Sequence, residues 1–250
     1  MAPSYALSLL VTAAFGAGVV DAIGGGGGLL TVPALLAVGL PPPLAIPTNK
    51  GQAVFGAVAS AVSFWRRQGI DRDRAALAFT CGALGSLGGA ALLLTMKPEP
   101  LKPIVLAMLV FAGVLVAVPR RIEARDKPIA HPRLVLVAIA LLLGFYDGFF
   151  GPGVGSLLII AFATFLGDSL TRASGNAKVV NLASNLAAFT IFTVLGKIQW
   201  GFALPMAVGN ACGAFVGARL ALRRGDRFVR VVLLCAVAGV AVKLGFDVFR

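Results

Sequence analysis

DAIGGGGGLLTVPALLAVGLPPPLAIPTNKGQ, residues 21–52, holds the features that decide the fold. The stretch contains one aspartate, a run of five glycines, a short apolar run at 28–40, three consecutive prolines and a Thr-Asn-Lys group. The prolines end the apolar run, because consecutive prolines cannot continue a helix. The pattern therefore predicts a short helix held between a glycine turn and a proline turn.

The composition places this stretch in a membrane protein. Of the 250 residues, 58% are hydrophobic and only 13% are charged, against about 25% charged in ordinary globular chains. Apolar segments of roughly 20 residues fill most of the chain, which leaves no room for a soluble catalytic domain. The net charge of +12 lies in short loops between apolar runs, as the positive-inside bias predicts, so no nucleic-acid partner is expected. The predicted fold class is an all-α polytopic membrane protein.

Apolar runs separated by polar or Pro/Gly breaks predict ten membrane elements. Two of them, 28–40 and 155–167, are short: each gives a helix of about 18–20 Å at 1.5 Å per residue, whereas the hydrocarbon core is about 30 Å thick. We interpret these two as broken or re-entrant helices that start near mid-membrane. Longer spans are expected at about 5–22, 49–65, 75–95, 101–118, 134–150, 176–195, 200–222 and 228–249.

The second half of the chain repeats the first half. Glycines and an asparagine recur at a constant spacing: Gly24, Gly26, Gly28 and Asn49 lie 127 residues before Gly151, Gly153, Gly155 and Asn176. Two halves of five membrane segments each have an odd count, so the second half must enter the membrane inverted. Short or glycine-interrupted segments at matching places of two inverted halves are typical of the binding site of a transporter.

The basic loops agree with the inverted arrangement. Loops 66–74, 119–133 and 223–230 carry the dense positive charge, and they share one side, the cytoplasm, when every run crosses once. The expected organisation is a first transmembrane repeat at 1–118, a basic cytoplasmic linker at 119–133 and a second, inverted repeat at 134–250.

Two glycine motifs are the first candidate site. Asp21 precedes Gly24–Gly28, and Asp147 precedes Gly151-Pro152-Gly153-Val154-Gly155. Glycines let backbone N–H groups approach a ligand, and a helix that starts there directs its positive end at an anion. The alternative is that these glycines only allow close helix packing, which is what we expect of the small-xxx-small glycines Gly82, Gly85, Gly89, Gly213 and Gly217.

Polar residues that follow each motif extend the site. Lys50 and Lys178 each stand at the start of a long apolar run. A charge there is costly unless it is paired or lines a water-filled cavity. The alternative is that these side chains extend to the membrane–water interface. Asp21 and Asp147 are expected to carry a coupling proton or to pair with these lysines. The predicted substrate-binding residues are Gly24, Gly25, Gly26, Gly27, Gly28, Thr48, Asn49, Lys50, Gln52, Gly151, Gly153, Gly155, Asn176, Lys178 and Asn181.

Enzyme chemistry is not expected. The only histidine, His131, lies in a proline-rich basic loop, and no nucleophile near a membrane-buried histidine offers a triad. Cys81, Cys212 and Cys235 lie in apolar runs without metal-ligand spacing. Neither a cofactor nor a metal is predicted.

The stretch DAIGGGGGLLTVPALLAVGLPPPLAIPTNKGQ resembles the signature region of the TauE/SafE sulfite exporter family of membrane transporters. The second-half stretches DGFFGPGVGSLLII and SGNAKVVNLASNLAAF resemble the repeat of that family, and the resemblance extends over essentially the whole chain. The triple proline Pro41–Pro43 is richer in proline than the usual pattern at that place.

The resemblance implies a secondary transporter of small sulfur-containing anions, such as sulfite and organosulfonates, in the bacterial inner membrane, often working outward. With the residue pattern, it predicts alternating access around a central anion site, with the lipid bilayer, the anionic substrate and a coupling proton or ion as partners. An anion channel and a transporter of another small solute stay open as alternatives. The sequence leaves substrate, direction and oligomeric state undetermined, a homodimer included.

Overall fold

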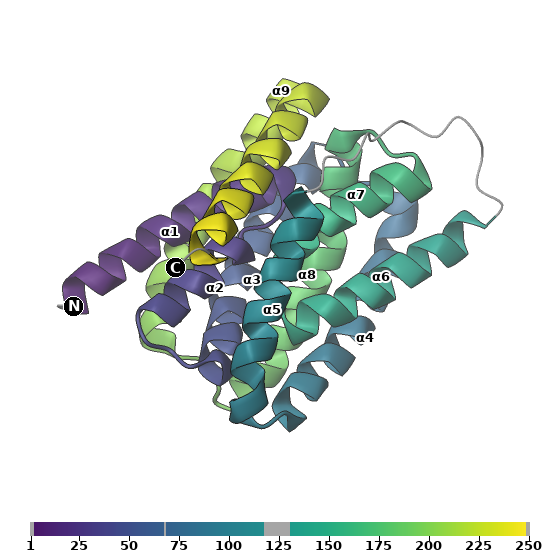
Figure 1. The fold of residues 1–250 in the computed structure, drawn as a ribbon. Helices are drawn as coiled ribbons and strands as arrows, with labels where there is room; N and C mark the ends of the chain where they lie inside the picture. The colour runs from purple at the N-terminus through teal and green to yellow at the C-terminus, as the bar shows by residue number, and fades with distance from the viewer. Residues whose placement is uncertain (1–2, 68, 118–130, 249–250) are drawn as a thin grey trace.

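A computed structural model describes residues 3–67, 69–117 and 131–248, and every regular element within these ranges is an α-helix (Figure 1). The all-α class expected from the composition is thereby confirmed. The expected linker at 119–133 lies outside the described residues up to position 130. The helices are α1 Pro3–Gly24, α2 Gly28–Ala37, α3 Pro42–Arg66, α4 Arg72–Thr95, α5 Pro98–Ala117, α6 Pro132–Phe149, α7 Val154–Leu166, α8 Leu170–Val194 and α9 Trp200–Val248.

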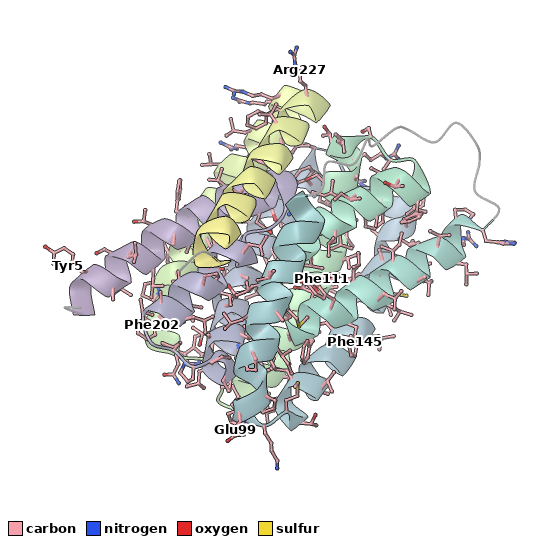
Figure 2. The ribbon with its side chains drawn as sticks, viewed as in Figure 1. Tyr5, Glu99, Phe111, Phe145, Phe202 and Arg227 are labelled. Carbon is pink, nitrogen blue, oxygen red and sulfur yellow. The ribbon has the colours of Figure 1, made fainter. Side chains whose placement is uncertain are left out.

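Within the described ranges, five helices are long and apolar enough to cross a membrane. They are Tyr5–Gly24, Arg72–Thr95, Pro132–Phe149, Leu170–Val194 and Trp200–Gly225. Large apolar side chains such as Tyr5, Phe111 and Phe145 point outward from the bundle, and Glu99 and Arg227 lie at opposite ends of it (Figure 2). An apolar girdle between polar ends is the surface that a bilayer requires.

Two short helices form near the expected positions, but the first ends at Ala37, before the prolines, where Gly39 has a left-handed φ of 97°. Helix α2 has 10 residues and α7 has 13, and each follows a glycine turn. The two last expected spans, 200–222 and 228–249, form two helices that carry the single label α9 and are separated by a kink at Gly225 (φ 68°, ψ −162°). Because α9 is two helices in series, the order of elements in the second part of the chain, α6 to α9, matches that of α1 to α5.

Helices α3 and α8 begin earlier than the sequence predicted. We expected spans from residues 49 and 176, but the helices start at Pro42 and Leu170. Proline is tolerated in the first turn of a helix, where its missing N–H has no partner to lose, and the Ser169 hydroxyl caps α8 by accepting a hydrogen bond from the Arg172 N–H. The polar residues around Lys50 and Lys178 therefore lie inside helices rather than at their entrances.

Two long contacts connect the parts of the chain. Helix α1 packs along α9, and α4 packs along α6. Both contacts rest on glycines: Gly213 and Gly217 face the backbone of α1 at Phe15 and Val19, as Gly85 and Gly89 face the backbone of α6 at Leu141 and Phe145. Small residues let membrane helices approach this closely. The packing role expected for the small-xxx-small glycines is therefore what the structure has.

The close contact at Gly85 gives a stability prediction. A methyl group there would meet the Phe145 N–H nitrogen at 2.8 Å and the Leu141 carbonyl oxygen, so Gly85→Ala is expected to cost about 1–3 kcal/mol through overpacking. Gly201→Ala is the matched control, because nothing lies within 4 Å of a Cβ at that position. Unfolding in detergent micelles measures both variants. Equal midpoints for the two would show that α4 and α6 are not packed as described.

Candidate functional site

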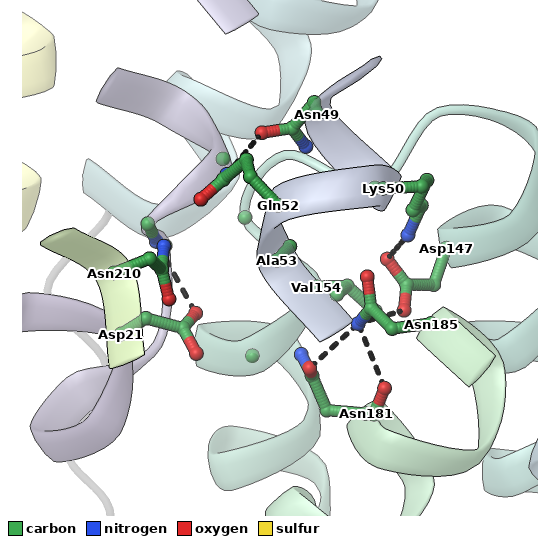
Figure 3. A pocket seen from close by; sticks show the side chains of 16 residues that line it. Asp21, Asn49, Lys50, Gln52, Ala53, Asp147, Val154, Asn181, Asn185 and Asn210 are labelled. Carbon is green, nitrogen blue, oxygen red and sulfur yellow. Dashed lines mark hydrogen bonds and ion pairs between the residues drawn. The ribbon is translucent and has the colours of Figure 1, made fainter. Parts of the chain in front are cut away.

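A small pocket lies where the two glycine motifs meet (Figure 3). Its volume of about 30 Å³ is room for roughly two water molecules, well below the 300–1,000 Å³ of pockets for drug-sized ligands. The pocket therefore excludes drug-sized ligands, and a sulfur oxyanion, which is larger than two water molecules, enters it only when the pocket widens. Of the sequence-predicted residues, it is lined by Asp21, Gly26, Gly27, Gly28, Asn49, Lys50, Gln52, Asp147, Gly151, Gly153, Gly155 and Asn181.

The glycines of the two motifs let the loops cross at close range. Gly25 and Gly26 have φ of 75° and 93°, a left-handed conformation that favours glycine. A Cβ on Gly155 would lie 2.7 Å from the Gly25 Cα, so a side chain at either position would push the loops apart. The Ser156 hydroxyl ties the crossing together by donating to the Gly24 carbonyl at 2.8 Å.

The crossing brings two helix N-termini to one pocket. Gly28 is the first residue of α2 and Gly155 the second of α7, and both line the pocket. First-turn N–H groups have no intrahelical acceptor, and the helix dipole adds partial positive charge at this end. Helix N-termini are suited to binding anions, and here one comes from each part of the chain.

Two lysine–aspartate pairs flank the crossing, and each connects one part of the chain to the other. Lys50 of α3 pairs with Asp147 of α6, with side chains only 1% and 3% exposed. Lys178 of α8 lies 3.2 Å from Asp21 Oδ2 of α1 and also donates to the Asp21 carbonyl. Buried charges persist when they are paired in this way. Lys50 lines the pocket, whereas Lys178 lies behind Asp21.

Polar groups on α8 hold Asp147 in place. The Ser184 hydroxyl donates to Asp147 Oδ2, and Asn185 Nδ2 approaches the same oxygen at 3.3 Å. Asn185 Nδ2 also donates to Asn181 Oδ1 at 2.7 Å, as Figure 3 shows. Residues 181, 184 and 185 share one helix face by their i, i+3 and i, i+4 spacing, and the face points at the pocket.

A second polar group lies on α3. Asn49 Oδ1 accepts hydrogen bonds from the Thr31 hydroxyl at 2.6 Å and from Gln52 Nε2 at 2.9 Å. Gln52 is 1% exposed, and its Oε1 has no hydrogen-bond partner among the described residues. Because Gln52 borders the pocket, its amide is a group that a bound solute or water can satisfy.

Five predicted residues do not line the pocket: Gly24, Gly25, Thr48, Asn176 and Lys178. Gly24 and Gly25 build the loop crossing, and Lys178 supports Asp21. Thr48 and Asn176 instead contact the residues that precede α9 and α4. The predicted substrate-binding set leaves out four lining residues, Ala53, Val154, Asn185 and Asn210. Asn210 carried a usable signal, a single amide within an apolar run.

Thr48 and Asn176 make equivalent contacts. The Thr48 hydroxyl accepts from the Gln199 N–H at 3.1 Å, just before α9 begins. Asn176 Oδ1 accepts from the Asp71 N–H at 2.8 Å, just before α4 begins. Each contact fastens one long helix to the start of a helix from the other part of the chain. We call the first the Thr48 clasp.

Charged residues strengthen only the second contact, which we call the charged clasp (Asp71, Arg74, Asp168 and Asn176). Arg74 bonds Asp71 at 2.7 Å and Asp168 at 2.8 Å, and Asn176 Nδ2 donates to Asp168 at 2.7 Å. Partial burial raises the pKa of Asp71, but the hydrogen bond and charge of Arg74 outweigh this, so its pKa lies below the ordinary 3.8. The carboxylate therefore stays ionised at neutral pH, and its contribution weakens only under strongly acidic conditions.

Comparisons with known proteins agree with this architecture. The chain matches the family model described as sulfite exporter TauE/SafE over residues 10–244. It is 34% identical over 245 residues to the probable membrane transporter protein YfcA of Escherichia coli (strain K12), covering 96% of this chain and 90% of that protein. A probable membrane transporter protein of Haemophilus influenzae is also 34% identical, with 96% and 95% covered. The probable membrane transporter protein ORF9 of a Sinorhizobium species is 32% identical, with 97% and 94% covered.

No solved structure matches the chain significantly. The family match extends over both glycine motifs and both clasps, so it includes the residues that build the pocket. The resemblance read from the glycine and Thr-Asn-Lys motifs is thereby confirmed. The chain is a multi-pass membrane transporter rather than an enzyme, and it belongs to the TauE/SafE sulfite exporter family.

Proposed function

We propose that this protein moves a small sulfur-containing anion, sulfite or an organosulfonate, across the bacterial inner membrane through the pocket between the glycine motifs. The observation that carries the proposal is the meeting of the α2 and α7 N-termini at a pocket lined by Lys50. Backbone amides and one ammonium group suit an oxyanion. The description of the family supplies the substrate class.

The transport mechanism that we propose is alternating access between two inverted halves, 1–118 and 134–250. The reciprocal pattern of contacts supports a repeat whose halves are related by a two-fold axis: α1 packs on α9 as α6 packs on α4, and Lys50 pairs with Asp147 as Lys178 pairs with Asp21. Binding sites of such transporters lie at broken helices near the membrane midplane. Asp21 and Asp147 are the candidates for a coupling proton.

The clasps fit this mechanism as two gates. Each fastens one half to the other at a different long helix, and access from a given side requires one of them to open. The charged clasp lies in the 66–74 region, and a Cβ on Gly69 there would be 3.0 Å from Leu222 of α9. The basic loops 66–74 and 223–230 are therefore neighbours, which supports a common cytoplasmic side.

Uptake into proteoliposomes tests the proposal. Purified protein is reconstituted and offered sulfite, methanesulfonate, taurine and sulfate, with Lys50→Ala, Lys178→Ala and the exposed loop variant Lys197→Ala in parallel. We expect saturable uptake of a sulfur oxyanion that is lost in Lys50→Ala, reduced in Lys178→Ala and unchanged in Lys197→Ala. If uptake by Lys50→Ala equals that of the wild type, the backbone amides are the only anion-binding groups. An anion current that does not saturate with concentration would identify a channel.

A further inference from the structure

We infer that Asp21 is the coupling carboxylate and that it works as a tethered competitor of the transported anion. This inference rests on the proposed function and concerns the same pocket. Asp21 Oδ1 accepts the Gly27 N–H at 3.3 Å, so its carboxylate already occupies an amide at the start of α2. A transported anion and the ionised Asp21 therefore compete for positive groups of the same kind.

Asp21 and Asp147 differ in how firmly they are held. Asp147 is 3% exposed, and its two oxygens hold Lys50, Ser184 and Asn185. The Asp21 side chain is 24% exposed and lines the pocket. Its oxygens contact the Gly27 N–H and Lys178 at 3.3 and 3.2 Å. Long, partly open contacts are weaker than compact buried ones. Of the two carboxylates, Asp21 is thus the one that a proton from the pocket can reach.

Charge balance supports a proton for each anion. The charged groups that face Asp21 are Lys178 of α8 and, across the pocket, Lys50 of α3 and Asp147 of α6. With Asp21 ionised, these four groups sum to zero, and a monoanion added to them is an uncompensated charge. A proton on Asp21 restores the balance. Lys178 then keeps its hydrogen bond to the Asp21 carbonyl and supplies the positive charge.

Competition between ionised Asp21 and the anion determines how anion affinity changes with pH. Anion binding and proton binding to Asp21 favour each other, so anion affinity rises as pH falls. Methanesulfonate is the suitable probe, because it stays a monoanion over the whole range and its own titration cannot cause the effect. In Asp21→Asn the competitor is permanently neutral. The variant is expected to bind methanesulfonate more tightly at neutral pH than the wild type, with an affinity that no longer changes with pH.

The experiment measures counterflow of labelled methanesulfonate and, with a pH dye inside the vesicles, the proton flux that accompanies net uptake. Wild-type protein is expected to show both. Asp21→Asn is expected to keep counterflow, which needs no net proton movement, and to lose proton flux to the level of protein-free vesicles. Asp21→Glu keeps a carboxylate and retains proton flux. Asp73→Asn, on an exposed residue of α4, is the matched control and behaves as the wild type.

The outcomes separate this inference from the proposed function. Absence of counterflow for every sulfur anion in the wild type overturns the proposed function and the inference with it. Wild-type counterflow without proton flux overturns the inference alone. Proton flux that survives in Asp21→Asn, or counterflow that disappears there while the protein still unfolds at the wild-type temperature, also overturns it. If Asp21→Asn does not fold, loss of proton flux in a folded Asp21→Glu variant decides against the inference.

Discussion

Replacing Lys50 with methionine is expected to destabilise the protein by about 3–5 kcal/mol, because it leaves the buried Asp147 charge without its partner. Asp147 cannot turn to solvent, since its side chain is 3% exposed. Ser184 and Asn185 still donate to it, but neutral donors do not replace a positive charge. The same substitution removes the ammonium group proposed to bind the anion, so uptake is also expected to fall to background.

A double-mutant cycle separates the two effects. Lys50→Met combined with Asp147→Leu removes both charges, and replacing a whole buried pair with apolar side chains is often neutral for stability. We therefore expect the double variant to unfold close to the wild-type midpoint in detergent and still to lack uptake. Lys197→Met, at an exposed lysine, controls for the general effect of removing a positive charge. Additive losses of stability in the double variant would contradict a direct pairing of the two side chains.

The elements of this fold follow well from local sequence signals. The glycine run marks where α2 begins, at Gly28, but the helix ends at Ala37, before the prolines, where Gly39 has a left-handed φ of 97°. The first residues of α3 and α8 are harder to predict from the sequence. Pro42 and Leu170 lie in stretches whose composition resembles that of loops. However, Pro42 is in the first turn of α3, and Leu170 follows Ser169, which caps α8.

The partners within the site could not be read from local pattern. Lys50 and Asp147 are 97 residues apart in sequence, and their meeting depends on how the two glycine loops cross. Asp168 follows a short apolar run and looks like a solvated loop residue, yet it is 8% exposed and bonded to Arg74. Periodicity identifies which face of a helix is polar, but only the packing of several helices determines what that face meets.

Removing the hydrogen bonds of the charged clasp is expected to change the side of the membrane from which the pocket is accessible. Arg74 holds Asp71 and Asp168 together, and their partner Asn176 on α8 is 5% exposed. Its counterpart, the Thr48 clasp, is a single neutral hydrogen bond. Hydrogen bonds to charged groups stabilise more than neutral ones do, about 1.5–3 against 0.5–1.5 kcal/mol. We therefore expect the resting protein to favour closure on the side of the charged clasp.

A cysteine at Ala53, which lines the pocket, reports this balance in a background where Cys81, Cys212 and Cys235 are alanine. Arg74→Ala is expected to raise labelling by an impermeant thiol reagent about tenfold from the side proposed as cytoplasmic, as the loss of one charge-assisted hydrogen bond predicts. Thr48→Val is expected to raise labelling by less, and from the opposite side. Arg223→Ala, an exposed arginine near the charged clasp, should change neither rate. Labelling that rises from the same side in both variants would contradict the inverted arrangement of the two halves, because the clasps would then close a single entrance.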